Sequence, residues 1–417
     1  MSDDSPHPEV SRACGLLDGE RPAPERAPLP VGARKFARIV VPNLFLISAV
    51  AAAVIALPFL GIGGPQFNHH YVKVPPNVGV VPVGQSIGVV PFANVVGGLR
   101  VQSLSELSQV LNPGVLTASG TNWTLHQPVV IAGGSRLILR GPGRLTLAPG
   151  SFLEVSLGGR ASITNLSIVG TGTAARRGFL FDSAGLLVLN HDDIQSLGRL
   201  ATFATGVTFA NAQPGSGVLN SVIIGNTDGV YAVATSGLVL QGNVISSSVL
   251  DGIYLRDQVS NLTVNANTVT TSGFDAIAVE NAGVHIVIAQ NTVTGAARYG
   301  ILLYNNVHAT TIRANHLSGA IDGVVVNSTT RASIAANTIS GEQRFGIRLS
   351  GPSLTNDVRR NQLAHCAVGI YLTSGATRNA IELNRFSSNG ENIRVRLSAP
   401  DNFVHPHPTN SEIAAGR

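Results

Sequence analysis

Charged residues and cysteine are both scarce in this chain. Only 12% of its 417 residues are charged, whereas 44% are hydrophobic, and lysine occurs only at Lys35 and Lys73. Helical globular proteins usually carry more charge, so this composition favours an all-β chain with small, uncharged turns. The two cysteines, Cys14 and Cys366, do not form a disulfide framework. We expect Cys366 to pack as a small apolar group.

The positive charge of the chain lacks the pattern of a nucleic-acid-binding protein. The formal net charge is +5 and the isoelectric point about 9.6. The arginines are spread through the loops and the N-terminal arm, without a dense basic run that contains aromatic residues. We therefore expect no nucleic-acid partner. The pair His69–His70 has no third ligand nearby, so we expect no metal site, and the sequence identifies no cofactor.

The N-terminal part contains one long apolar run. Residues 1–33 are rich in Pro, Ser and charged residues, which predicts a disordered cytoplasmic arm. The run Ile39–Ile62 is long enough to cross a bilayer and follows the basic segment Arg34–Arg38, which predicts a transmembrane signal anchor over 34–63. The positive flank predicts a cytoplasmic N-terminus and an exported body. A cleaved signal peptide, which would give a secreted protein, is the alternative.

The rest of the chain divides into a linker, a body and a tail. Residues 64–98 are rich in Pro, Gly and Val and predict an extended linker. The leucine spacing of 103–111 predicts a short amphipathic helix. We expect it to cap the body, which spans 99–397, because a solenoid exposes an apolar end. Residues 398–417 form the C-terminal tail.

A motif of 22 to 24 residues repeats through the second half of the sequence. Each copy carries an Asn, and a small residue, mostly Gly, follows it eight or nine positions later. A fixed period of this length indicates a solenoid. The recurring residues are Asn220, Asn243, Asn267, Asn291, Asn315, Asn337, Asn361 and Asn384.

Apolar and polar residues alternate on both sides of each Asn, so the local period is two, as in β-strands. The apolar positions are mostly β-branched, which strands prefer. Three short strands in each repeat predict an all-β parallel β-helix, in which like side chains stack on like. We expect the Asn amides to form a structural ladder through the turns. Its predicted members are Asn243, Asn267, Asn291, Asn315, Asn337 and Asn361.

Alignment of the repeats brings one set of polar residues onto three adjacent coils. Tyr and Asn bond sugar hydroxyls, and Arg can clamp a carboxylate with two parallel hydrogen bonds, so this face predicts an acidic polysaccharide partner. An Asp before Gly is also ordinary turn chemistry, which is the alternative for the Asp column. The predicted binding residues are Asp251, Asp275, Glu280, Asn281 and Tyr304, and the predicted catalytic residues are Tyr254, Arg256 and Asp257.

The segment RGFLFDSAGLLVLNHDDIQSLG and the Asn coils after it resemble the right-handed β-helix family of mannuronan C5-epimerases. They also resemble the broader group of carbohydrate-binding and sugar-hydrolase β-helix proteins. The resemblance covers about 122–397 and implies a right-handed, pectate-lyase-like β-helix. The family carries Asp-Pro-His-Asp after Tyr-Gly-Ile. Here Asp251-Gly252-Ile253 precedes Tyr254-Leu255-Arg256-Asp257, so only Asp257 matches and the catalytic motif is not retained.

The resemblance implies chemistry at C5 of a uronate. Such chemistry needs a group that neutralises the carboxylate, a base and an acid. Arg256 is the candidate for the first role, Tyr254 and Tyr304 are the candidates for proton exchange, and we expect no His on this face. A hydrolase that uses paired carboxylates is the other enzymatic option. A non-catalytic envelope scaffold that binds glycan or protein is the alternative to both.

Overall fold

The computed structural model describes residues 81–82, 94–199, 205–396, 399 and 401–405. The predicted arm, the predicted transmembrane anchor, most of the linker and most of the tail lie outside these residues. Within the described part of the chain, no helix is long and apolar enough to cross a membrane.

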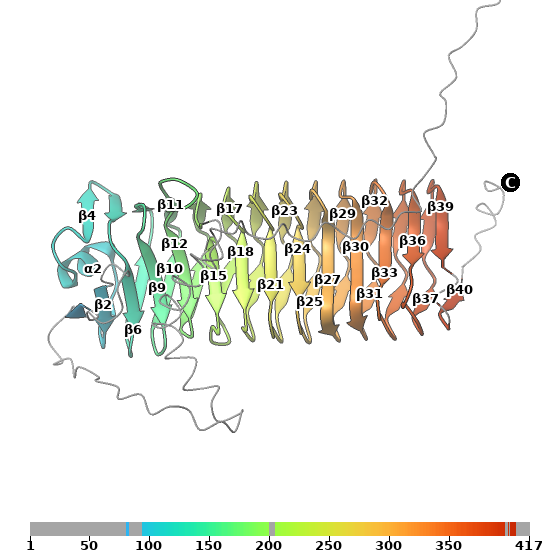
Figure 1. Cartoon of the computed structure of the whole chain (residues 1–417). Coiled ribbons are helices and arrows are strands. Elements are labelled where there is room, and N and C mark those ends of the chain that lie inside the picture. Colours follow the sequence, from blue (N-terminus) through green and yellow to red (C-terminus); the bar gives the residue numbers. More distant parts are fainter. Residues whose placement is uncertain (1–80, 83–93, 200–204, 397–398, 400, 406–417) are drawn as a thin grey trace, which may run out of the picture.

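The body is a right-handed parallel β-helix built from three long sheets (Figure 1). We name them sheets A, B and C. Sheet A contains β1 (Val81–Pro82), β2 (Asn94–Gly97), β6 (Val129–Ala132), β9 (Phe152–Ser156), β12 (Phe179–Ser183), β15 (Val207–Ala210), β18 (Val230–Val233), β21 (Ile253–Arg256), β24 (Ile277–Glu280), β27 (Tyr299–His308), β30 (Asp322–Thr330), β33 (Phe345–Ser350), β36 (Val368–Leu372) and β39 (Glu391–Val395).

Sheet B contains β3 (Arg100–Val101), β7 (Arg136–Arg140), β10 (Arg160–Thr164), β13 (Leu186–Asn190), β16 (Gly217–Leu219), β19 (Val239–Gln241), β22 (Thr263–Asn265), β25 (Val287–Ala289), β28 (Thr311–Arg313), β31 (Ser333–Ala335), β34 (Asp357–Arg359), β37 (Ala380–Glu382) and β40 (Phe403–His405). Sheet C contains β4 (Leu116–Ser119), β5 (Asn122–Leu125), β8 (Arg144–Leu147), β11 (Ser167–Gly170), β14 (Asp193–Gln195), β17 (Val222–Ile224), β20 (Val244–Ser246), β23 (Thr268–Thr270), β26 (Thr292–Thr294), β29 (His316–Ser318), β32 (Thr338–Ser340), β35 (Gln362–Ala364) and β38 (Arg385–Ser387).

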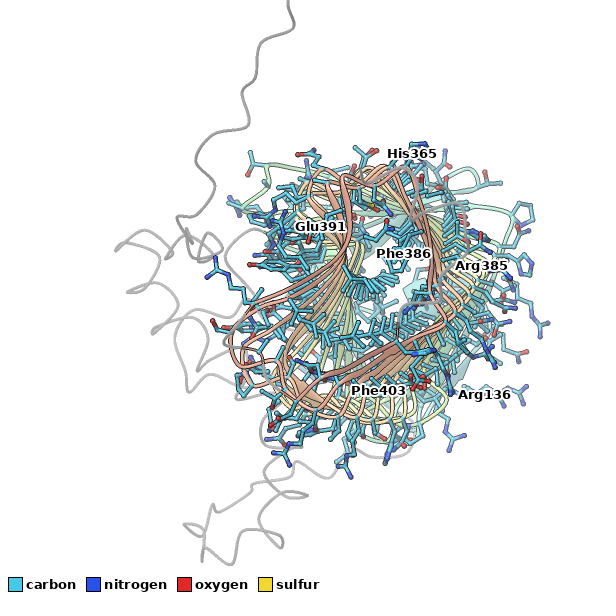
Figure 2. All side chains as sticks on the ribbon, turned by 90° about the vertical axis from the view of Figure 1, so that its right-hand side faces the viewer. Arg136, His365, Arg385, Phe386, Glu391 and Phe403 are labelled. Carbon is cyan, nitrogen blue, oxygen red and sulfur yellow. The ribbon has the colours of Figure 1, made fainter. Side chains whose placement is uncertain are left out.

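Each regular coil contributes one strand to each sheet, and each strand pairs in parallel with the equivalent strand of the next coil. The predicted apolar columns point into the coil and form one continuous core. Val264, Ile288 and Ile312, for example, stack on β22, β25 and β28 and are fully buried. Seen along the axis, Phe386 points into this interior, whereas Arg385 points outward (Figure 2). Cys366 is buried, and its thiol donates to the carbonyl oxygen of Ala364 at 3.4 Å.

A short helix, α2 (Leu104–Val110), lies at the N-terminal end of the solenoid (Figure 1). Its N-cap Ser103 accepts the amide of Glu106 at 3.0 Å, and the Glu106 carboxylate accepts the amide of Gln102 at 2.7 Å. This reciprocal arrangement is a capping box. Leu104 and Leu107 turn their side chains into the first coil. The predicted short helix is thus present, and it is one residue shorter at each end than the predicted 103–111.

The six Asn predicted as a ladder form a continuous one. In each step the side-chain amide donates both to a backbone carbonyl and to the next Asn. For Asn267 these bonds reach Leu240 O at 2.9 Å and Asn291 Oδ1 at 3.0 Å. The same Oδ1 of Asn291 accepts the backbone amide of Asn267 at 2.9 Å. Each Asn therefore satisfies buried backbone groups that the turn removes from the sheets.

Asn220 is not part of the ladder, although it is one of the recurring Asn residues of the sequence repeat. It is exposed, and Ser221 occupies the ladder position, where its amide donates to Asn243 Oδ1 at 3.0 Å. Pairing of β16 with β19 sets Leu219 opposite Gln241, and Ser221 is therefore the residue opposite Asn243. The spacing between these two ladder positions is thus one residue shorter than the spacing from Asn220 to Asn243. The sequence also missed a second ladder, at the turn between sheets A and B, in which Asn356 bonds Asn379 and Asn379 bonds Asn402.

We expect Asn291→Ala to lower the free energy of unfolding by about 2–4 kcal/mol. The substitution leaves the buried carbonyl of Val264 and the buried amide of Asn267 without their partners. Asn265→Ala, at a partly exposed position on β22, is the matched control and should change stability much less. Denaturant unfolding measures both. Equal losses in the two variants would show that the ladder adds nothing specific.

Glu342 is a buried carboxylate at the turn between sheets C and A. Its side chain is 2% exposed, and its Oε2 accepts the amide of Ala320 at 2.6 Å. Its Oε1 is buried without a hydrogen-bond partner in the described part of the chain. Burial, together with the nearby Asp322 carboxylate, raises the pKa of Glu342 to about 7, and the bond from Ala320 only partly opposes this.

This raised pKa predicts that stability falls as the pH rises. The protonated form is favoured in the fold, so its stabilisation is complete below the ordinary pKa of 4.5 and is lost as the pH rises through about 7. The cost above that pH is roughly 3 kcal/mol or less. Glu342→Gln should therefore raise the melting temperature at pH 8 and not at pH 4. Glu382→Gln, on the outer side of β37, is the control. A pH-independent effect of Glu342→Gln would contradict the expectation.

Candidate functional site

The outward face of sheet A carries an apolar cluster of its own. Its members are Tyr231, Tyr254, Ala278, Tyr299, Leu302 and Val325, each at most 4% exposed. The Tyr254 hydroxyl donates to Glu280 Oε2 at 2.7 Å, and its ring packs edge-on against Tyr231. The structure therefore brings the predicted residues Tyr254 and Glu280 together, but it buries the tyrosine beneath the surface.

Arg256 ends β21 beside this cluster. Its Nε donates to Asp257 Oδ2 at 2.6 Å, and its guanidinium lies 5.6 Å from the centre of the Tyr254 ring. Its side chain is 28% exposed. Partial burial acts to lower the pKa of Arg256, but Tyr254 and Asp257 outweigh it and raise the pKa above its ordinary value. Arg256 thus keeps its positive charge at the edge of sheet A, where Asp257 pairs with it.

A groove of about 770 Å³ begins at Asp257 and runs along the turn between sheets A and B. One carboxylate and two amides form a hydrogen-bonded row along it. Asn281 donates to Asp257 Oδ1 at 2.9 Å, and Asn305 donates to Asn281 Oδ1 at 2.9 Å. The exposed side chain of Tyr304 precedes Asn305 at the end of this row. The groove is lined by Asp257, Gln258, Asn281, Ala282, Asn305, Asn306, His308, Ser328, Thr330 and Pro352.

The backbone of the groove explains part of its composition. Asp257, Asn281 and Asn305 all have φ between 53° and 59°, and the residue after each is also left-handed. Asn and Asp tolerate this conformation better than other residues with a side chain. The turn therefore favours short polar side chains, and this repeated corner presents them in a row.

His308 also lines the groove, although we expected no His on this face. Its Nδ1 lies 2.5 Å from Thr330 Oγ1, and its Nε2 lies 2.7 Å from Asn306 Oδ1. Strand β27 continues through the turn, with a register shift between Tyr304 and Val307, and so carries His308 to this side. The sequence could have indicated this position, because His308 aligns with Val284 of the preceding repeat, just after the turn.

The Asp column lies below the surface. Asp251 and Asp275 are 1% and 0% exposed, although both were predicted to contact substrate. The amide of Asp275 donates to Asp251 Oδ1 at 2.9 Å, and Asp275 Oδ1 accepts the amide of Tyr299 at 3.2 Å. Arg298 also binds Asp275 through Nε at 2.9 Å and Nη2 at 2.5 Å. Here the geometry agrees with the alternative of turn chemistry.

A second group of arginines, which sequence reasoning missed, lies farther along sheet A. Arg344 binds both oxygens of Asp322, at 3.1 and 2.9 Å, and the Nε of Arg348 lies 3.2 Å from the same carboxylate. Arg348 also donates to the Tyr299 hydroxyl at 3.1 Å. Two guanidinium groups thus share one carboxylate, which leaves a net positive charge. The sequence did contain a sign of this group, because Arg348 occupies the same position of its repeat as Tyr254.

Two family models match this sequence. The model described as "Right handed beta helix region" matches residues 155–317, and the model described as "Periplasmic copper-binding protein (NosD)" matches residues 275–417. Copper sites need clustered ligands, and no group of three or more His, Cys, Asp or Glu that could hold a metal occurs among the described residues. We therefore assign no step to a metal. No curated protein matches the sequence.

The fold is similar to several solved structures. The periplasmic alginate epimerase AlgG is 17% identical with a TM-score of 0.63, over 74% of this chain and 86% of that chain. A mutant of AlgG is 18% identical with a TM-score of 0.68, over 76% and 85%. The A-module of the Azotobacter vinelandii mannuronan C-5 epimerase AlgE4 is 17% identical with a TM-score of 0.50, over 75% and 91%. At this identity the likeness concerns the fold. This chain is a right-handed parallel β-helix protein.

Proposed function

We propose that this protein binds an acidic polysaccharide along the outward face of sheet A. The observation that supports this most directly is the presence of partly exposed guanidinium groups at two places on one face. Arg256 lies beside the end of the groove at Asp257, and Arg348 lies on the coil that contributes Pro352 at the other end. The alginate and mannuronan epimerases with this fold act on polymers of this class, which supports the same choice.

Arg256 is the first anion contact in this proposal. It uses Nε for Asp257, and its two terminal nitrogens have no hydrogen bond to a described residue. A planar guanidinium can direct such donors to a sugar carboxylate. The row of Asn281 and Asn305 beside it presents amides to the groove, where they can bond sugar hydroxyls. The same side chains thus supply both a charge contact and neutral contacts.

Arg348 is the second anion contact. From β21 to β33 the sheet advances by four coils, so the two arginines are about 19 Å apart along the axis. Ala278, Leu302 and Val325 form an apolar strip in the column that runs from Tyr254 to Arg348, whereas the column of Arg256 continues through Glu280, Tyr304 and Asn327. A linear polymer laid along the axis would contact a cation at each end of this strip and the groove at its side.

The burial of Tyr254 weighs against proton transfer by that residue, since its hydroxyl is bonded to Glu280. Modification of the epimerase or lyase type is therefore the second candidate function. It is favoured by His308, whose imidazole lies in the groove that Asp257 begins. Histidine is the side chain that most often transfers protons in general acid–base catalysis.

The apolar run Ile39–Ile62 adds a location to the proposal. We propose that it anchors the chain in a membrane, with the N-terminus in the cytoplasm and the β-helix outside. Arg34–Arg38 supports this orientation, because positive residues remain on the cytoplasmic side. A polysaccharide partner would be met on the outer side.

We expect Arg256→Ala and Arg348→Ala each to weaken binding of a long oligouronate about tenfold or more, because each removes a charged hydrogen-bond donor. Calorimetric titration measures the affinity. Arg313→Ala, at an exposed position on β28 of sheet B, should leave it unchanged. For oligomers too short to contact both arginines at once, the affinity should not depend on whether both arginines are present. Unchanged affinity in both variants, or no binding of any acidic polymer, would contradict the proposed function.

Exchange at C5 distinguishes binding alone from modification. If His308 exchanges protons with a bound uronate, incubation in deuterated water should place deuterium at C5 or create unsaturated ends, visible by NMR. His308→Ala should abolish this signal while the affinity falls little. Binding without any exchange would exclude the catalytic candidate and leave a glycan-binding scaffold.

A further inference from the structure

Three arginines stack directly over one another at the start of sheet B. Arg100 on β3 pairs with Arg136 on β7, and Arg136 pairs with Arg160 on β10. All three are exposed. Figure 2 shows Arg136 on the outside of the coil. Arg140, at the other end of β7, is exposed on the same outer face. We name these four residues the arginine face.

The arginine face is not neutralised by its surroundings. Like charges directly opposite on neighbouring strands repel, and these strands are only about 4.8 Å apart. None of the four arginines forms an ion pair with another described residue, and β3, β7 and β10 contain no acidic residue. A fold that stacks three guanidinium groups in this way gains from an external anionic partner.

The arginine face is confined to the N-terminal end of the solenoid. In the next coil the column continues with Leu186. Farther along sheet B, Arg359 is paired with Asp357 at 3.1 Å. The arginine face therefore begins in the first coil, to which β2 and β3 belong, at the N-terminal end of the solenoid (Figure 1). Residues 1–93, which precede this coil in the sequence, include the apolar run Ile39–Ile62.

We propose that the arginine face docks on the anionic headgroups of a lipid membrane. This inference rests on the proposed membrane anchor. The segment 63–93 joins Ile39–Ile62 to this end of the body, so a bilayer that holds the apolar run is tethered to the end that carries the arginine face. Each arginine near such a surface strengthens the attraction about fivefold, so four together form a strong contact. The attraction extends only about 8 Å at physiological salt, and it should weaken as salt is added.

The docked position limits the orientation of the solenoid to two arrangements. With its first coils on the membrane, the β-helix extends away from the bilayer, or leans on it along the outer side of sheet B. Sheet A, which carries Arg256 and Arg348, lies on a different side of the coil from sheet B and stays accessible. The same fold then separates two anion contacts, one for lipid headgroups and one for the polysaccharide.

The chain has a native reporter for this docking. Trp123 is the only tryptophan in the sequence and lies on β5, whose first residue pairs with Arg144 in the first coils. The full-length protein is reconstituted with vesicles of phosphatidylcholine, with or without phosphatidylglycerol, that carry a dansyl group on a small share of headgroups. Energy transfer from Trp123 to dansyl then reports how close the arginine face is to the membrane.

We expect strong transfer with anionic vesicles at low salt. Most of it should be lost in 0.5 M salt, because the Debye length falls from about 30 Å at 0.01 M salt to well below about 8 Å. The triple variant Arg100→Gln, Arg136→Gln and Arg160→Gln should show the low transfer of neutral vesicles. The control variant Arg313→Gln, Arg331→Gln and Arg385→Gln removes the same charge from exposed positions elsewhere and should behave as the natural protein. Circular dichroism checks that both variants fold.

The outcomes separate this inference from the anchor. Failure of the protein to float with vesicles in high salt would refute the anchor, whereas salt-sensitive transfer would still support docking. Flotation with transfer that ignores lipid charge, salt or the triple variant would overturn docking and leave the anchor intact. Binding of a soluble acidic polymer that depends on the arginine face, without any lipid-dependent transfer, would also overturn it.

Discussion

Stacking of one coil on the next is the constraint on which this structure depends. Each strand of the regular coils pairs with its equivalents in the neighbouring coils, so the backbone groups at the turns need other partners. The Asn ladder meets this need, because each Oδ1 accepts from the coil before it, as Asn291 does for Asn267. The ladder therefore holds the register of the coils, and the register decides which side chains share a face.

Stacking also forces like residues to meet like, and the chain resolves the resulting charge in two ways. The Asp column is kept below the surface, where Asp251 and Asp275 accept backbone amides and Asp275 binds Arg298. The column that starts at Arg100 has no such partners within the described chain and remains exposed. One charged column thus became part of the fold, while the other remains available to a partner outside the chain.

Periodic features could be predicted from the sequence, and features that break the period could not. The core columns, the capping helix and the six ladder Asn follow from repeat spacing and residue type. Asn220 was misplaced because its coil is one residue shorter at the ladder, so that Ser221 takes the position. His308 was missed because a register shift in β27 moves it into the groove. The burial of Asp251 was not visible in the sequence, since a turn residue can point either way.

The same reasoning explains why the face of sheet A suits a linear polymer better than a small substrate. Its centre is an apolar strip, and the Tyr254 hydroxyl there is already bonded within the protein. Its polar groups lie instead at the margins, with Arg256 at one end, Arg348 four coils farther along, and the groove along the side. A small molecule could use only one of these margins at a time. A ligand that gains from both must be extended and must carry repeated negative charge, and this requirement follows from the spacing of the coils.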